Sequence, residues 1–285
     1  YKRQRYRDLY HRLHAEVDGP IDRVRRAVTD GGSDQAVIVR TSDHGELLGA
    51  HGGLHQKWFN LYDEATRVPF SIARIGHRAT SGASVDAAPT SHVDIVPTLL
   101  AAAGIDEAMV AAVLRSDFSE VHNLPGTDLM PVVDDPAVAD NDRRVYLLTR
   151  DNMPEGDSGA SGLARQLGRV EKQPAPMRIQ VPAHVAANFE RLVARVGDDV
   201  AGGAGHLWKL VRSFDDPATW TEPSQRHLAA TGPAGPEYRT AVIPDQWELY
   251  DLDVDPIEAS NRWDDPTATD VFTQLRGRLA DEAAV

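Results

Sequence analysis

The sequence predicts an α/β fold: part of a mostly parallel sheet flanked by helices, followed by a smaller C-terminal subdomain with a short antiparallel sheet. Three observations predict it. The apolar run from Ala36 to Val39 has no polar alternation, which is typical of a strand buried on both faces of a parallel sheet. Helical patterns stand before and after this run. Short strand patterns, separated by polar, proline-rich segments, occupy the second half of the chain.

The first helical pattern covers residues 6–28, where apolar residues recur at steps of three or four. They are Leu9, Leu13, Val17, Ile21, Val24 and Val28. Gly19-Pro20 interrupts the pattern. We expect a kink or a split there, because proline lacks the amide proton that a helix interior needs.

A second strand is predicted over residues 68–73, and a loop over residues 76–89, which are rich in Gly, Ala and Ser. Ser91, followed three residues later by Asp94, indicates a helix start of the capping-box type. A helix over residues 95–103 is expected to follow it. The order helix, strand, strand, helix favours an α/β layer.

The second half of the chain predicts a smaller unit with mixed or antiparallel strands. Strands are predicted at 145–149, 207–211 and 247–252, a helix at 185–196, and an inserted excursion near 151–200. Asp and Asn residues cluster around position 138. We therefore divide the chain into residues 1–138 and residues 139–285.

Composition narrows the class of partner. The 285 residues include 30 Lys+Arg and 43 Asp+Glu, a formal net charge of −13. This acidic balance argues against nucleic acid or an anionic membrane as the main partner. No run approaches the roughly 18 apolar residues of a membrane span, so we predict a soluble protein. The sequence contains no cysteine, which excludes disulfides and a cysteine nucleophile. The compartment is undecided, with the cytoplasm preferred.

The stretch from Thr41 to Trp58 carries the chemistry, because it begins where the buried strand ends. Ligands of open α/β sheets bind outside the carboxyl ends of strands. Asp43 and His44 are adjacent there, and both can meet one ion if the backbone turns, which Gly45 permits. A carboxylate with an imidazole suits a divalent cation of intermediate hardness.

Further along the same stretch, glycines alternate with polar side chains. His51, His55 and Lys57 follow within fifteen residues of Asp43. Flexible backbone near a cation, with imidazole and ammonium donors, suits an anionic tetrahedral group.

This stretch resembles a signature region of the sulfatase family, in the alkaline phosphatase superfamily. The matching segments are 41–45, 48–58, 62–64, 67–69, 91–100, 103–105, 124–129, 248–252, 255–256 and 258–261. In this order they resemble the C-terminal half to two-thirds of such an enzyme, from about Tyr6 to Asn261. The resemblance implies that residues 1–138 are the C-terminal part of the α/β catalytic domain.

The resemblance also implies roles for five residues. Asp43 and His44 would be ligands of one divalent metal ion, with Ca²⁺ as the first choice and Mn²⁺ or Zn²⁺ as alternatives. Lys57 would bind the sulfate oxygens and act in catalysis. His51 would be a second catalytic side chain, and His55 would bind substrate.

The sequence departs from the family at the nucleophile. Sulfatases use a formylglycine made within a Cys/Ser-x-Pro/Ala-x-Arg motif, and this sequence has no match to it. We therefore expect a missing N-terminal segment or a companion chain to supply the nucleophile. The implied reaction converts a small-molecule sulfate ester into an alcohol and inorganic sulfate. The alternatives are a phosphodiesterase or phosphonate monoester hydrolase of the same superfamily, and a non-catalytic partner subunit.

Overall fold

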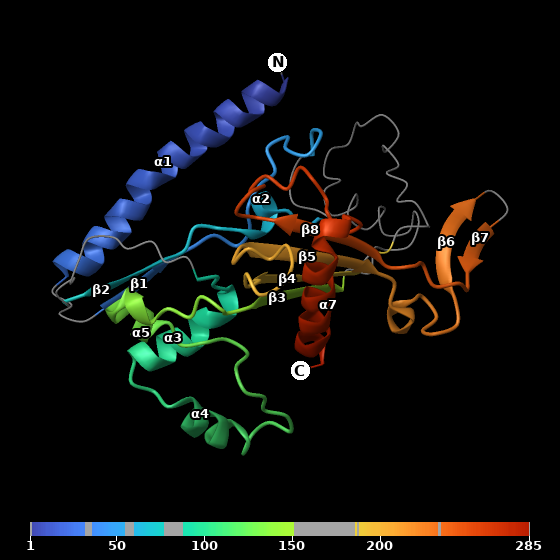
Figure 1. Cartoon of the computed structure of the whole chain (residues 1–285). Helices are drawn as coiled ribbons and strands as arrows, with labels where there is room; N and C mark the ends of the chain where they lie inside the picture. Colours follow the sequence, from blue (N-terminus) through green and yellow to red (C-terminus); the bar gives the residue numbers. More distant parts are fainter. Residues whose placement is uncertain are drawn as a thin grey trace. The chain divides into compact units, whose positions relative to one another are not determined.

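The computed structural model describes residues 2–31, 36–54, 60–76, 88–150, 186, 188–232 and 235–284. The chain divides into two compact units, Tyr1–Val145 and Tyr146–Val285. The helices and strands of the first unit are α1 (Lys2–Asp30), β1 (Ala36–Arg40), α2 (Asp63–Thr66), β2 (Ser71–Ile75), η1 (His92–Asp94), α3 (Ile95–Ala102), α4 (Glu107–Leu114), α5 (Met130–Asp134) and η2 (Pro136–Val138). Figure 1 shows these elements in sequence colours.

The long helix α1 runs without a break through Gly19-Pro20, so the chain is not split there. None of its residues is buried, and its apolar residues from Leu9 to Val24 remain largely exposed. Proline is tolerated at position 20, since one missing backbone hydrogen bond leaves the other turns of a long helix intact.

The sheet of the first unit corrects one expectation. β1 pairs with β2 in antiparallel register, with Ala36 opposite Ile75 and Arg40 opposite Ser71. The prediction of a mostly parallel sheet is therefore not confirmed. The residues of β1 are half-buried, apart from an exposed Arg40, so the prediction of burial on both faces is wrong for the described residues. A continuous apolar run indicates a strand, but it carries no information on the direction of its neighbour.

The start of α3 follows the predicted capping box. The carboxylate Oδ2 of Asp94 accepts the backbone N–H of Ser91 at 2.7 Å. α3 then covers Ile95–Ala102. Gly104 follows the C-cap residue Ala103, and its φ of +67° favours glycine. No single helix among the described residues is long and apolar enough to cross a membrane.

The second unit is built on a sheet of strand order β3-β4-β5-β8. Its elements are β3 (Val145–Arg150), β4 (Asn188–Arg195), β5 (Leu207–Phe214), η3 (Pro217–Thr219), β6 (His227–Gly232), β7 (Gly235–Arg239), β8 (Gln246–Asp251), η4 (Pro266–Ala268) and α7 (Thr269–Ala283). β3, β5 and β8 confirm the three predicted strands. β5 pairs antiparallel with both β4 and β8. The antiparallel sheet of the C-terminal subdomain is therefore confirmed.

The helix predicted at 185–196 is wrong, because residues 188–195 form β4. Apolar residues spaced three and four apart also fit a strand that is buried along nearly its whole length. Glu190 and Arg191 are themselves buried, so the alternation typical of a strand is hidden. The excursion predicted near 151–200 falls mainly outside the described residues, and β4 occupies part of it.

The core of the second unit lies between this sheet and α7, which Figure 1 shows crossing the sheet. Its members are Leu192, Ala194, Val196, Trp208, Leu210, Leu249, Ala268, Val271, Leu275 and Leu279. The α7 members Val271, Leu275 and Leu279 recur every four residues on one face of the helix. This sheet-and-helix layer gives the second unit its own core.

His227, at the start of β6, is expected to make the second unit less stable at mildly acidic pH. Burial lowers the pKa of His227, and the positive charge of Arg239 lowers it further against the opposing effect of Asp215. Nδ1 of His227 accepts the backbone N–H of Thr221 at 3.1 Å, so it is unprotonated in this arrangement. A folded pKa below the unfolded value gives stability that is present above about pH 6.5 and is lost as pH falls toward the folded pKa.

We expect His227→Asn to remove this part of the pH dependence, because the asparagine oxygen accepts a hydrogen bond but does not titrate. The thermal midpoint of the second unit, measured between pH 7.5 and 5.0, tests this. The exposed His122, in the first unit, provides a His→Asn control. An unchanged pH profile in His227→Asn would contradict the prediction.

Candidate functional site

Asp43 and His44 lie together just beyond the end of β1. Oδ2 of Asp43 is 3.2 Å from Nε2 of His44, and the side chains are 81% and 39% exposed, respectively. Adjacent residues reach one another here because the chain has left the extended conformation of the strand. The structure thus brings the two predicted metal ligands together at an accessible position.

The hydrogen bonds of His44 define which ring nitrogen faces Asp43. Nδ1 lies 2.8 Å from the carbonyl oxygen of Gly45. A carbonyl oxygen only accepts, so Nδ1 carries the proton and Nε2 faces the carboxylate. Nε2 of His44 and Oδ2 of Asp43 are both atoms that can bind a cation, and they face one another at this point. The donor set fits a divalent cation in this respect.

The carboxylate of Asp43 is fixed by its own backbone. The N–H of His44 donates to Oδ1 at 3.0 Å, and this hydrogen bond is the main cause that lowers the pKa of Asp43. Ser42 donates its hydroxyl to the carbonyl oxygen of His44 at 2.8 Å, which holds the turn. Asp43 is therefore ionised at neutral pH, as a metal ligand must be.

Gly45 is required by close approach rather than by a left-handed backbone. Its N–H donates to the carbonyl oxygen of Ala65 at 2.9 Å. A Cβ at position 45 would collide with the carbonyl group of Glu64. The absence of a side chain thus lets the turn formed by Asp43, His44 and Gly45 pack directly on α2.

The segment 48–53, which we call the glycine loop, has an unusual backbone. Leu48 and His51 have positive φ angles of 49° and 47°, and Gly49, Gly52 and Gly53 have φ angles of 92°, 80° and 107°. Its ends are joined by the N–H of Gly49, which donates to Leu54 at 2.8 Å. This compact loop leads directly to residues 55–59.

His51 is packed against α2. Its Nε2 lies 3.0 Å from Oε2 of Glu64, and its ring stacks on Tyr62 with centroids 3.6 Å apart and planes at 8°. The His51 side chain is 12% exposed. These contacts explain how His51 holds the glycine loop in place, while its catalytic role stays a prediction.

The two remaining predicted site residues, His55 and Lys57, lie outside the described residues. Within the described part of the chain, no group of three or more His, Cys, Asp or Glu side chains could hold a metal ion. Asp43 and His44 would therefore need ligands from elsewhere to complete a metal site.

Close to Asp43 in the chain, Thr41 begins a set of hydrogen bonds that the sequence predicts only in part. Oγ1 of Thr41 lies 2.9 Å from Nε2 of His92, which joins the end of β1 to η1. Asp94 is fully buried; its carboxylate pairs with Arg143 and accepts the N–H of Thr127 at 2.9 Å. The capping-box pattern identifies Asp94, but no sequence signal connects it with Arg143.

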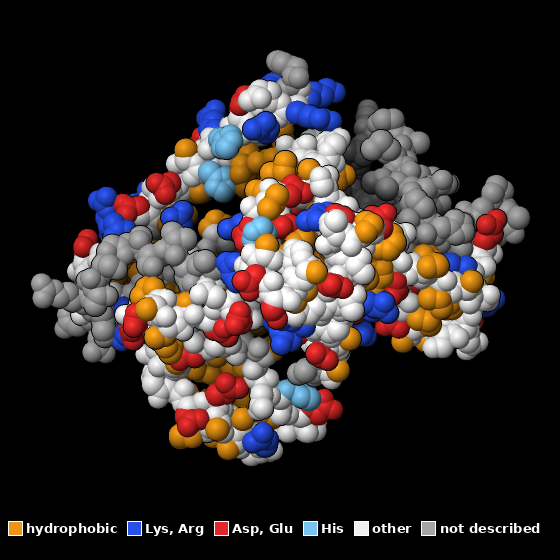
Figure 2. Space-filling view, viewed as in Figure 1, with side chains coloured by type: hydrophobic (Ala, Val, Ile, Leu, Met, Phe, Trp, Pro, Cys, Tyr) orange, Lys and Arg blue, Asp and Glu red, His pale blue; other side chains and the backbone are white. Residues whose placement is uncertain are grey.

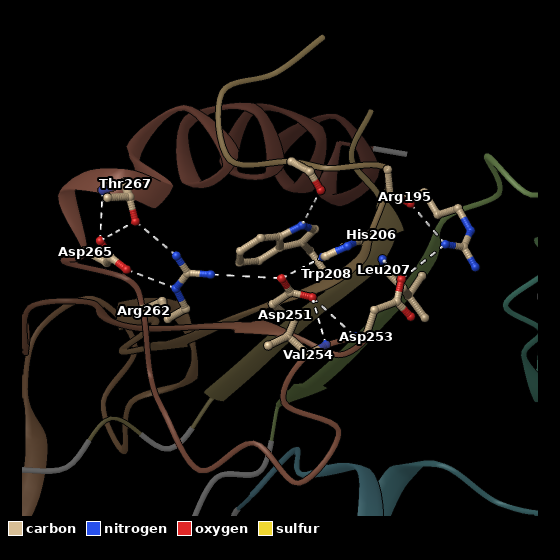
Figure 3. Close-up of polar contacts among 12 residues, drawn as sticks. Arg195, His206, Leu207, Trp208, Asp251, Asp253, Val254, Arg262, Asp265 and Thr267 are labelled. Carbon is tan, nitrogen blue, oxygen red and sulfur yellow. Dashed lines mark hydrogen bonds and ion pairs between the residues drawn. The ribbon is translucent and has the colours of Figure 1, made fainter. Parts of the chain in front are cut away.

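A second polar cluster lies in the C-terminal unit, where the start of β5 meets the end of β8 and the segment after it (Figure 3). His206 Nδ1 is 2.9 Å from Oδ2 of Asp251, and Arg262 Nε is 3.0 Å from Oδ2 of Asp265. The guanidinium of Arg262 also lies over the Trp208 ring, 5.2 Å from its centroid. These residues bind one another, and the cluster thereby holds the segment with Arg262 and Asp265 against β5 and the end of β8.

Comparisons with known proteins bear on the first unit most strongly. Residues 1–105 match the family model described as Sulfatase. The uncharacterized sulfatase YidJ of Escherichia coli (strain K12) is 39% identical over 101 residues, which are 35% of this chain and 19% of that protein. These matches confirm the predicted resemblance to the sulfatase family.

Two solved structures share the fold. BT4656 in complex with its substrate D-glucosamine-2-N,6-O-disulfate gives a TM-score of 0.56 at 20% identity, covering 93% of this chain and 38% of that chain. The phosphonate monoester hydrolase of Agrobacterium radiobacter gives 0.55 at 22% identity, covering 95% and 39%. They confirm the α/β class. This chain spans under two fifths of either neighbour.

Proposed function

We propose that this chain, which matches the sulfatase family over residues 1–105, is part of a metal-dependent sulfatase that hydrolyses sulfate esters to an alcohol and inorganic sulfate. One observation carries the proposal. Asp43 and His44, at the start of the matched signature, lie 3.2 Å apart at the end of β1 with their ligand atoms facing one another.

The residues of this chain would divide the work of binding and charge stabilisation. Asp43 and His44 would hold one divalent ion, with Ca²⁺ preferred and Mn²⁺ or Zn²⁺ as alternatives. When bound, such an ion neutralises sulfate oxygens and orients the attacking group. Lys57 would bind the sulfate and stabilise the charge that develops as the ester bond breaks. His55 would contact the substrate, and His51, at the glycine loop, would be the second catalytic side chain.

The nucleophile would come from a further part of the protein, either a preceding segment or a companion chain. The proposal rests on the missing formylglycine motif and on the missing third metal ligand among the described residues. It is supported by apolar side chains left exposed on α1 and α3, such as Leu9, Val96 and Leu99 at 53%, 51% and 43% exposure. Faces of this kind are typical of surfaces that pack against another element.

A phosphonate monoester hydrolase or phosphodiesterase remains the second candidate, because the Agrobacterium radiobacter hydrolase shares the fold as well as BT4656 does. Both reactions act on tetrahedral anions. The completed enzyme should hydrolyse 4-nitrophenyl sulfate faster than bis(4-nitrophenyl) phosphate. The reverse preference would favour the second candidate.

Metal binding can be tested on this chain at millimolar Ca²⁺, because two protein ligands with water at the remaining positions should bind the ion weakly but specifically. A titration with Ca²⁺, followed by the amide NMR signals of Asp43 and His44, should show saturable binding that Asp43→Asn abolishes. Asp106→Asn is the matched control, since Asp106 is an exposed helix cap remote in sequence from the site. Equal binding by Asp43→Asn and the native chain would reject the proposed metal site.

Lys57→Ala is expected to lower the turnover of the completed enzyme about a hundredfold, because removal of one preorganised donor typically costs about 3 kcal/mol of transition-state stabilisation. The metal content should stay unchanged, since Lys57 is not a ligand. Turnover within threefold of the native enzyme would remove Lys57 from the mechanism.

A further inference from the structure

The guanidinium of Arg3 lies against the glycine loop. A Cβ added to Gly53 would stand 2.8 Å from Cζ of Arg3 and still closer to one of its terminal nitrogens. The guanidinium therefore occupies the space that a side chain at position 53 would fill. Gly53 has a φ of +107°, which also favours glycine.

A second contact fixes the start of α1 beside the same loop region. Tyr6 forms a side-chain hydrogen bond with Glu46, which directly follows Gly45 in the chain. Arg3 and Tyr6 thus hold the start of α1 against the chain at Gly53 and at Glu46.

The positive charge of Arg3 is available to bind an anion. In the part of the chain that the structure describes, Arg3 forms no ion pair and no side-chain hydrogen bond. The first turns of α1 carry Lys2, Arg3, Arg5 and Arg7 before the first acidic residue, Asp8. Figure 2 shows Lys and Arg side chains gathered over this end of α1. In a chain of net charge −13, such a local group is what attracts an anion.

We propose that Arg3 is a substrate-binding side chain that contacts an anionic oxygen group held at the glycine loop. This inference rests on the proposed function and adds a specificity residue to it. A guanidinium presents paired N–H donors that match the oxygens of a sulfate or carboxylate. Gly53 leaves the space in which that guanidinium reaches the loop.

The experiment titrates the ¹⁵N-labelled full chain with sodium sulfate at constant ionic strength and follows the backbone amide signal of Gly53, which every Arg3 variant retains. Arg3→Gln should weaken sulfate binding about fivefold, the size expected of one exposed charge pair. Arg3→Lys should retain part of the affinity. Arg23→Gln is the control, since Arg23 lies beside Gly19 on the same helix and is exposed.

Alanine variants of Gly53 and Gly52 separate the effect of losing the Arg3 contact from the effect of straining the backbone. Gly53→Ala should weaken sulfate binding as Arg3→Gln does, with little further loss in the double variant. Gly52→Ala imposes a similar left-handed strain, because Gly52 has a φ of +80°, yet its added Cβ meets nothing within 4 Å. Gly52→Ala is therefore the control for strain, and it should weaken sulfate binding less than Gly53→Ala does.

The outcomes also separate this inference from the proposed function. Equal weakening in Arg3→Gln and Arg23→Gln would mean non-specific screening and would overturn the inference. If Ca²⁺ binds at Asp43 but Arg3→Gln leaves sulfate binding unchanged, the role of Arg3 is rejected and the proposed metal site is not. An Arg3 effect without Ca²⁺ binding would support the anion contact and reject the proposed metal site.

Discussion

Replacement of Asp94 by asparagine is expected to destabilise the N-terminal unit by about 3–5 kcal/mol, the typical cost of breaking a buried ion pair. The Asp94 carboxylate is fully buried and pairs with Arg143. It also accepts the backbone N–H groups of Ser91 at 2.7 Å and Thr127 at 2.9 Å. An asparagine NH₂ group cannot accept from these donors, so either the Ser91 N–H or the Thr127 N–H loses its acceptor.

Asp106→Asn is the matched control for this variant. Asp106 is exposed and caps α4 by accepting the N–H of Ala108 at 2.7 Å. Asparagine caps helices as well as aspartate does, so this change should be nearly neutral. The measurement is urea unfolding, followed by exchange of the Thr127 amide. A free energy of unfolding within about 0.5 kcal/mol of the native value would contradict the expected result.

The consequence of Asp94→Asn should extend to the candidate metal site. η1 contains both Asp94 and His92, and His92 lies 2.9 Å from the Thr41 hydroxyl at the end of β1. Loosening of η1 should therefore weaken Ca²⁺ binding at Asp43 without removing a ligand.

Replacement of Glu258 by glutamine is expected to destabilise the C-terminal unit by a similar amount, about 3–5 kcal/mol. Glu258 pairs with Lys209 of β5, and both side chains are fully buried. Loss of the carboxylate charge would leave the ammonium group of Lys209 buried without its counter-ion. Tryptophan fluorescence during urea unfolding reports on this unit, since Trp208 lies in its core.

Glu222→Gln is the corresponding control. Glu222 pairs with Arg226 on the surface, where the side chains are 39% and 46% exposed, so its loss should cost under about 1 kcal/mol. The double variant Lys209→Met, Glu258→Leu should recover most of the stability, because apolar groups of similar size fill such sites well. Equal unfolding midpoints for Glu258→Gln and Glu222→Gln would show that the buried pair contributes little.

The sequence by itself determined the features that depend on residues close together in the chain. The capping box of Ser91 and Asp94, the helix that follows it and the three strands β3, β5 and β8 depend on short-range spacing and turn residues. The adjacency of Asp43 and His44 is a property of the sequence, and the structure only turns their side chains toward one another.

Only the tertiary structure decided the features that depend on contacts between residues distant in the chain. The same apolar spacing fits a helix or a buried strand, and the pairing with β5 made residues 188–195 a strand. The antiparallel pairing of β1 with β2, the partnership of Asp94 with Arg143 and the contact of Arg3 with Gly53 join residues far apart in the chain. Such pairings follow from packing, which no local pattern encodes.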